Sequence, residues 1–295
     1  MWVAITFAAA TFQILRTSRQ HRLRANLSTN AAGFVRYAYA APLAAILFAI
    51  WFGAADHAVP TVAARFWWIV AVAGLGQILG TYFLLASFKA RSFAIGTVYS
   101  KAEIVIVGLL GMAATGDTLG PAAWAGVLTC TVGVASLASH GSLRAIVSTP
   151  LDRAALLGIG AGAGFAIASV AIRAGTQSLD GGTSWDKALV TLTVMLTFQL
   201  LANGAHLLTT DRPSLVRVFR SWRAALPIGI LSLAGSAAWA WAMALEAAAK
   251  VRTLGQVELL IAFAVARITL RERHTRAENV ASALVLAGVV LVVAG

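Results

Sequence analysis

Charged residues are scarce in this sequence. Asp, Glu, Lys and Arg make up only 12% of the 295 residues, whereas 59% are hydrophobic and the mean hydropathy is +0.81. A soluble domain of this length needs roughly 25% charged residues to cover its surface. The shortage excludes a soluble globular protein and predicts an integral membrane protein.

Residues that catalysis and metal binding need are also few. The single cysteine, Cys130, lies in an apolar run and excludes an intramolecular disulfide. The five histidines are scattered, and no glycine-rich phosphate loop ending in Lys-Ser/Thr occurs. Nothing resembles a Ser/His/Asp or HExxH arrangement. We therefore expect no metal, no cofactor, no enzyme activity and no ATP-driven transport within this chain.

The formal net charge of +12 would suggest a nucleic-acid partner in a soluble protein. In short loops of a membrane protein, basic residues instead fix the orientation and meet anionic lipid head groups. The expected partners are a lipid bilayer and a small-molecule substrate, with no nucleic acid, and the chain is expected to be a monomer or homodimer.

What the sequence does have is apolar runs of the length that a membrane-spanning helix needs. Barrel strands would instead alternate in segments of about ten residues. Ten spans leave only short loops, and Met1 leads into a retained span rather than a cleaved signal. The expected spans are Trp2–Leu15 with a polar extension to about Gln20, Ala31–Phe52, Phe66–Phe88, Ser92–Met112, Pro121–Ser139, Ala154–Gly175, Trp185–Leu208, Ala224–Leu245, Arg252–Leu270 and Glu278–Gly295.

The two halves of the chain resemble each other. Six matches fall at two constant offsets, 159 and 155 residues, which indicates a duplication. We expect five helices in residues 1–139, a connecting loop over 140–153 and five more helices in 154–295. The matches are Gly76-Gln77 with Gly235-Ser236 and Tyr82 with Trp241 at the first offset, then Glu103 with Glu258, Asp117 with Glu272 and Gly133 with Gly288 at the second.

Loop charges indicate that the two halves are inverted. An odd number of spans in each half puts equivalent loops on opposite sides of the membrane, where the Lys/Arg bias differs. Counted together with the first three residues of the following span, the first loop has four arginines and its equivalent, the sixth, has one lysine. The second has one arginine and the seventh four, and the fourth has none and the ninth three. The third and eighth are tied. The sequence therefore predicts two inverted five-helix repeats in an all-α membrane protein.

An acidic loop residue before a glycine-containing last helix occurs in both halves, as Asp117 with Gly133 and Glu272 with Gly288. With the duplication, this resembles the drug/metabolite transporter superfamily and its ten-helix EamA-type exporters. The resemblance implies a carrier with a central cavity, and members export amino acids and other metabolites or exchange phosphorylated sugars. Such carriers are usually drawn with both termini inside, whereas the charge bias here, 15 Lys/Arg in odd loops against four in even loops, favours termini outside.

Three charged residues lie near the middle of predicted spans. Glu103 and Glu258 are equivalents in the two repeats, and Lys101 lies two residues before Glu103. A carboxylate in mid-membrane is costly unless it is paired, protonated or facing water, so it indicates a functional site. Proton coupling or substrate binding is one hypothesis; the alternative is a structural clasp, which would need a partner on another helix.

Polar and aromatic residues at similar depth could line a cavity around these charges. The candidates are Tyr99, Gln77, Ser236, Trp239, Gln256, Gln13, Tyr82 and Trp241. Aromatic residues in spans more often pack or anchor than bind ligands, so this part of the prediction depends on geometry.

The function that we expect is secondary transport, with export of a small polar metabolite such as an amino acid by alternating access. The location that we expect is the cytoplasmic membrane of a bacterium. Charges of both signs favour a zwitterion. A multidrug or quaternary-cation exporter, an exchanger of phosphorylated anions and, least of all, a membrane-embedded enzyme remain the alternatives.

Overall fold

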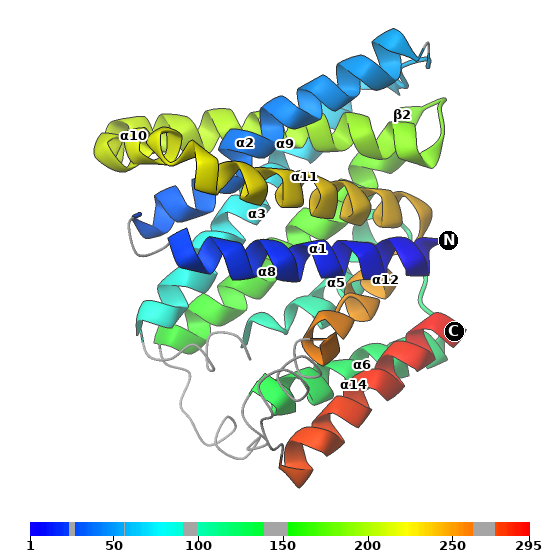
Figure 1. Cartoon of the computed structure of the whole chain (residues 1–295). Helices are drawn as coiled ribbons and strands as arrows, with labels where there is room; N and C mark the ends of the chain where they lie inside the picture. Colours follow the sequence, from blue (N-terminus) through cyan, green and yellow to red (C-terminus); the bar gives the residue numbers. More distant parts are fainter. Residues whose placement is uncertain (24–26, 56, 91–98, 139–152, 262–274) are drawn as a thin grey trace. The chain divides into compact units, whose positions relative to one another are not determined.

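A computed structural model of the chain describes residues 1–23, 27–55, 57–90, 99–138, 153–261 and 275–295 (Figure 1). Nearly all of the described residues are helical. The elements are α1 (Trp2–Leu23), α2 (Thr29–Ala49), the π-helix η2 (Ile50–Ala54), β1 (Thr61–Val62), α3 (Ala64–Ala90), α5 (Glu103–Ala114), α6 (Pro121–Ala138), α8 (Arg153–Gln177), β2 (Leu179–Asp180), α9 (Ser184–Thr210), α10 (Arg212–Arg220), α11 (Trp222–Leu245), α12 (Ala248–Leu254) and α14 (Arg276–Ala294).

Within the described part, six helices are long and apolar enough to cross a membrane, which confirms an all-helical membrane chain. They cover Asn30–Ala54, Ala64–Ser87, Arg153–Gln177, Ser184–Thr210, Trp222–Leu245 and Arg276–Ala294. Two shorter apolar helices cover Glu103–Ala114 and Pro121–Leu137. These helices are fewer than the ten predicted spans, so the number ten stays a prediction. Parts of the fourth and ninth predicted spans lie outside the described residues.

Two compact units make up the chain, and neither follows a sequence half. The first unit consists of Met1–Ile78 and Ala171–Leu245, and the second of Leu79–Val170 and Glu246–Gly295. Helices α3 and α8 therefore each contribute to both units. In the first unit α1 packs on α11 and α2 packs on α9 and α11; in the second α5 packs on α12 and α6 on α14.

The two ends of the first unit are formed by different loops. At one end the short strands β1 and β2 pair antiparallel, with Thr61 opposite Asp180. This pair is a small departure from the all-α prediction. Close to it in the chain, the indole of Trp51 donates to Asp186, whose carboxylate also completes a capping box with Thr183. Loops two and six, as numbered between the predicted spans, therefore meet at this end.

Loops one and seven meet at the other end of the first unit. The phenol of Tyr39 in α2 donates to the carbonyl of Val218 in α10 at 3.0 Å. Asp211 caps α10 and accepts hydrogen bonds from Ser28 and Ser214, which hold the pKa of the Asp211 carboxyl below its usual 3.8. The sequence prediction contains no helix here, because α10 lies in a nine-residue basic stretch that is too short and too polar to cross a bilayer.

Glycines set the distance between α6 and α14, which lie side by side (Figure 1). A Cβ on Gly288 of α14 would lie 2.5 Å from the backbone nitrogen of Cys130 in α6. A Cβ on Gly133 of α6 would lie 2.7 Å from the backbone nitrogen of Val285 in α14. Small residues at these crossings allow the two backbones to touch, as is common between helices in membranes.

Candidate functional site

Two helices of the second unit are interrupted, and the interruptions carry the charged residues. Tyr99 and Ser100 are helical, Lys101 and Ala102 form a turn, and α5 begins at Glu103. The backbone N–H of Ile104 donates to the carbonyl of Lys101, so a three-residue spacing replaces the four-residue spacing of an α-helix.

The equivalent segment of the other sequence half is interrupted in the same way. Helix α12 ends at Leu254, Gly255 and Gln256 form a turn, and residues 257–261 are helical again. The backbone N–H of Glu258 donates to the carbonyl of Gly255 at 3.1 Å. The offset of 155 residues that pairs Glu103 with Glu258 also pairs Lys101 with Gln256, so the two turns fall within one residue of equivalent positions. Because α5 packs on α12, the two turns lie close together.

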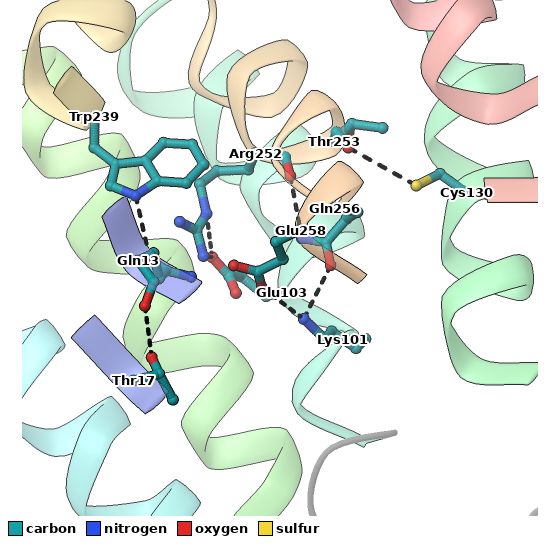
Figure 2. Close-up of polar contacts among 10 residues, drawn as sticks. All are labelled: Gln13, Thr17, Lys101, Glu103, Cys130, Trp239, Arg252, Thr253, Gln256 and Glu258. Atoms are coloured by element: carbon teal, nitrogen blue, oxygen red, sulfur yellow. Dashed lines mark hydrogen bonds and ion pairs between the residues drawn. The ribbon is translucent and has the colours of Figure 1, made fainter. Parts of the chain in front are cut away.

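The first ion pair joins Glu103 to Arg252 of α12 (Figure 2). Both Nε and Nη2 of Arg252 lie 2.6 Å from the same carboxylate oxygen, and the Glu103 side chain is only 5% exposed. Charge-assisted contacts this short are strong, and they compensate a buried carboxylate. The partner of Glu103 is thus on another helix, as a clasp between helices requires.

The second ion pair joins Lys101 to Glu258 and is looser. The Lys101 ammonium lies 3.7 Å from a Glu258 oxygen and donates to the side-chain oxygen of Gln256 at 2.9 Å (Figure 2). The Gln256 amide in turn donates to the carbonyl of Arg252, one helical turn earlier. The side chains of Lys101 and Glu258 are 13% and 18% exposed, so Glu258 is less enclosed than Glu103.

The structure therefore brings Lys101, Glu103, Glu258 and Gln256 together, and adds Arg252, which the sequence analysis did not select. We call these five residues the charge cluster. Two carboxylates and two basic groups give it a formal charge of zero when all four are ionised. Tyr99, which is half-buried, lies two residues before Lys101.

The remaining candidate cavity residues lie in several places. In the first unit, the Trp239 indole donates to Gln13 at 3.2 Å, and Gln77 accepts a hydrogen bond from Gln199 of α9 at 2.9 Å. Ser236 is half-buried on α11.

Trp241 and Tyr82 have other surroundings. The Trp241 indole donates to Ser184, the first residue of α9, and its ring packs edge-on against Trp185. These contacts place it at the end of α9 near the β1–β2 pair. Tyr82 is 52% exposed on α3 and packs against the ring of its neighbour Phe83. The cavity role of all these residues stays a prediction.

Arg252 and Gln199 are the polar residues that the sequence analysis missed. Arg252 is the first residue of the predicted span Arg252–Leu270, where a basic residue normally reaches the interface. Its four-residue spacing to Gln256 was the available signal, because residues four apart share one helix face. Gln199 sits in an otherwise apolar run of α9, where its side chain is fully buried and bonds to Gln77 and to the carbonyl of Gly74.

Apolar helices that bury paired charges at interrupted positions define a polytopic membrane protein with a polar site inside it. Residues 152–294 match the model of the EamA-like transporter family. This match confirms the resemblance predicted from sequence, and the family consists of membrane transporters of the drug/metabolite transporter superfamily.

Comparison with solved structures supports the fold across the whole chain. One of them, described only as "Crystal structure of protein", aligns with a TM-score of 0.73 and 16% sequence identity. The alignment covers 99% of this chain and 96% of that one. At this identity the likeness concerns the fold alone. No curated protein matches the sequence.

Proposed function

We propose that the chain is a secondary transporter that exports a small zwitterionic metabolite, such as an amino acid, by alternating access. The observation that carries the proposal is the charge cluster: two acid–base pairs at the interruptions of two helices that pack against each other. Interrupted helices at mid-membrane are where secondary transporters bind their substrates and coupling ions. A zwitterion can bind between the two members of one such pair, with its carboxylate at the basic group and its ammonium at the acidic group. The site then carries no net charge within the membrane.

Ten spans in two inverted five-helix repeats are part of the same proposal. Three helix pairs that the repeats make equivalent, α2 with α9, α5 with α12 and α6 with α14, pack against each other. Within the first unit, loop one lies with loop seven and loop two with loop six. Loops one and six, which are equivalents, are therefore at opposite ends, as inversion requires.

The two ion pairs have different roles in this mechanism. The Glu103–Arg252 pair is short and buried, and it holds α5 against α12. The Lys101–Glu258 pair is longer and more exposed, so it opens at lower cost. The substrate carboxylate then binds Lys101 and its ammonium binds Glu258. Once separated from Lys101, Glu258 is also the group that can take up a proton when the substrate has left.

Solute counterflow tests the proposal directly. Purified protein in liposomes loaded with one unlabelled solute is supplied with the same solute in labelled form, and the panel contains the common amino acids, tetraphenylphosphonium and a sugar phosphate. We expect accumulation of at least one amino acid. Lys101→Gln and Glu258→Gln should each reduce it at least tenfold, whereas Asp180→Asn, which alters an exposed carboxylate on β2, should not.

Each other outcome decides against a stated part of the proposal. Accumulation of tetraphenylphosphonium or the sugar phosphate alone would establish a cation or an anion carrier instead of a zwitterion carrier. Full activity of both variants would make the Lys101–Glu258 pair structural. Proton coupling is tested by an imposed pH gradient, which should stimulate uptake in the wild type and have no effect on the residual uptake of Glu258→Gln.

A further inference from the structure

Helix α10 contributes no residue to the charge cluster, and side-chain contacts attach it to the first unit. Ser214 and Val218 are buried, and their four-residue spacing puts them on the face that meets the protein. The Val218 carbonyl accepts the hydrogen bond from Tyr39, and the ring of Phe219 lies 6.4 Å from that of Phe34 in α2. The position of α10 is therefore set by side-chain contacts along its length.

The outward face of α10 is both apolar and basic. Val216 is 43% exposed, and Phe219 and Trp222 are each 51% exposed. Four arginines, at positions 212, 217, 220 and 223, are exposed along the same twelve residues. A helix with large apolar side chains among arginines is typical of a segment that lies in the plane of a membrane interface.

The two last arginines have no described acidic partner. Arg217 donates to Ser214 and lies near the Asp211 carboxylate. By contrast, no carboxylate among the described residues pairs with Arg220 or Arg223, and the guanidinium of Arg223 lies 5.5 Å from the centre of the Trp222 ring. Residues 212–223 contain no acidic residue at all.

We propose that α10 and the Trp222–Arg223 step form a binding site for the head group of an anionic phospholipid. Arg220 ends α10 and Arg223 lies in the first turn of α11, only three residues further along the chain, so both guanidinium groups can donate to one phosphate. The exposed rings of Phe219 and Trp222 lie beside them at the depth of the head groups and upper acyl chains. The occupant is a lipid rather than a soluble phosphate because exposed apolar side chains lie next to the arginines along residues 216–223.

A simpler account of these arginines must be separated from the proposal. Basic residues in the last turn of any helix interact favourably with its C-terminal carbonyls, and basic loops orient membrane proteins without binding a particular lipid. Neither role distinguishes phosphatidylglycerol from phosphatidylcholine at a defined site. Head-group selectivity is therefore the property to measure.

Native mass spectrometry of the purified full chain with phosphatidylglycerol and phosphatidylcholine of equal chain length makes that measurement. We expect the wild type to retain phosphatidylglycerol in preference to phosphatidylcholine. Each arginine near an anionic head group contributes about a fivefold preference, so Arg220→Gln/Arg223→Gln should bind phosphatidylglycerol about 25-fold more weakly. The lysine pair Arg220→Lys/Arg223→Lys should retain most of the binding.

The matched control removes the same charge elsewhere. Arg65→Gln/Arg153→Gln alters two exposed arginines on α3 and α8 and should leave the preference unchanged. Arg223→Gln alone, which lies beyond the end of α10 and cannot weaken that helix, should cost about fivefold. A wild type that retains both lipids equally, or a control that loses as much as the α10 variant, would overturn the proposal.

Discussion

Removing the basic partner of Glu103 should be one of the most costly single changes in the second unit. Arg252→Met deletes both donors that lie 2.6 Å from the Glu103 carboxylate, and it leaves that carboxylate 5% exposed among apolar helices. Breaking a buried pair from one side typically costs about 3–5 kcal/mol, because a buried charge then has no compensation. We expect a loss of this size in the free energy of unfolding.

The matched change at the second pair should cost less. Lys101→Met also removes a basic partner from a carboxylate, but Glu258 lies 3.7 Å from the ammonium and is 18% exposed. We expect a loss of about 1 kcal/mol, since a longer and wetter contact contributes less. We propose that the Glu103–Arg252 pair holds α5 against α12 and that the Lys101–Glu258 pair opens. The ratio of the two losses in free energy of unfolding tests this assignment better than either value alone.

A double-mutant cycle separates loss of the pair from loss of packing. Arg252→Met/Glu103→Leu replaces both charges with apolar side chains, which is often neutral or stabilising for a buried ion pair. The double variant should therefore recover most of the stability lost in Arg252→Met. Equilibrium unfolding in mixed micelles, followed by tryptophan fluorescence, gives the free energies. Equal losses for Arg252→Met and Lys101→Met, or additive losses in the cycle, would refute the reasoning.

Three further changes test other parts of the molecule. Gly288→Ala should lower the free energy of unfolding by about 1–3 kcal/mol through overpacking, because its Cβ would lie 2.5 Å from the facing helix backbone, whereas Gly53→Ala, with open space around it, should be nearly neutral. Trp51→Phe removes the 2.7 Å hydrogen bond to Asp186 and should cost about 1–3 kcal/mol in the same unfolding assay; no change would show that the bond does not form in the membrane protein. The carboxyl of Asp211, whose pKa is lowered by two serine contacts, stabilises the folded state above pH 3.8 and loses this effect as the pH falls through its lowered folded-state pKa. Asp211→Asn should accordingly show a smaller drop in thermal midpoint between pH 5 and pH 3 than the wild type.

Most helix positions were predictable because the sequence contains long runs of apolar residues. The span predicted from Pro121 begins at that residue in α6, and the predicted Trp185–Leu208 lies within α9. A run of about 20 apolar residues has few alternatives in a bilayer, where every backbone group must be bonded internally. The same rule explains why the small β1–β2 pair lies between spans rather than within one.

The interruptions were not predictable from hydropathy, which does not register a change in hydrogen-bond spacing. Lys101 and Gln256 were selected as polar residues inside continuous helices, yet each lies in a turn. Repeat equivalence did indicate the right location, since Glu103 and Glu258 lie beside those turns. The pairing itself, Glu103 with Arg252 and Lys101 with Glu258, depends on how α5 packs on α12, and no local pattern contains that information.

The division into two units determines when each can fold as the chain emerges from the ribosome. The chain passes from the first unit to the second within α3, returns within α8 and leaves again after Leu245. Helix α1 must therefore wait for α11, more than 200 residues later, before its main packing partner exists. Pairings this distant make assembly slow. A nascent chain released at Leu245 already contains every residue of the first unit, whereas the second unit, with its charge cluster, requires the last fifty residues.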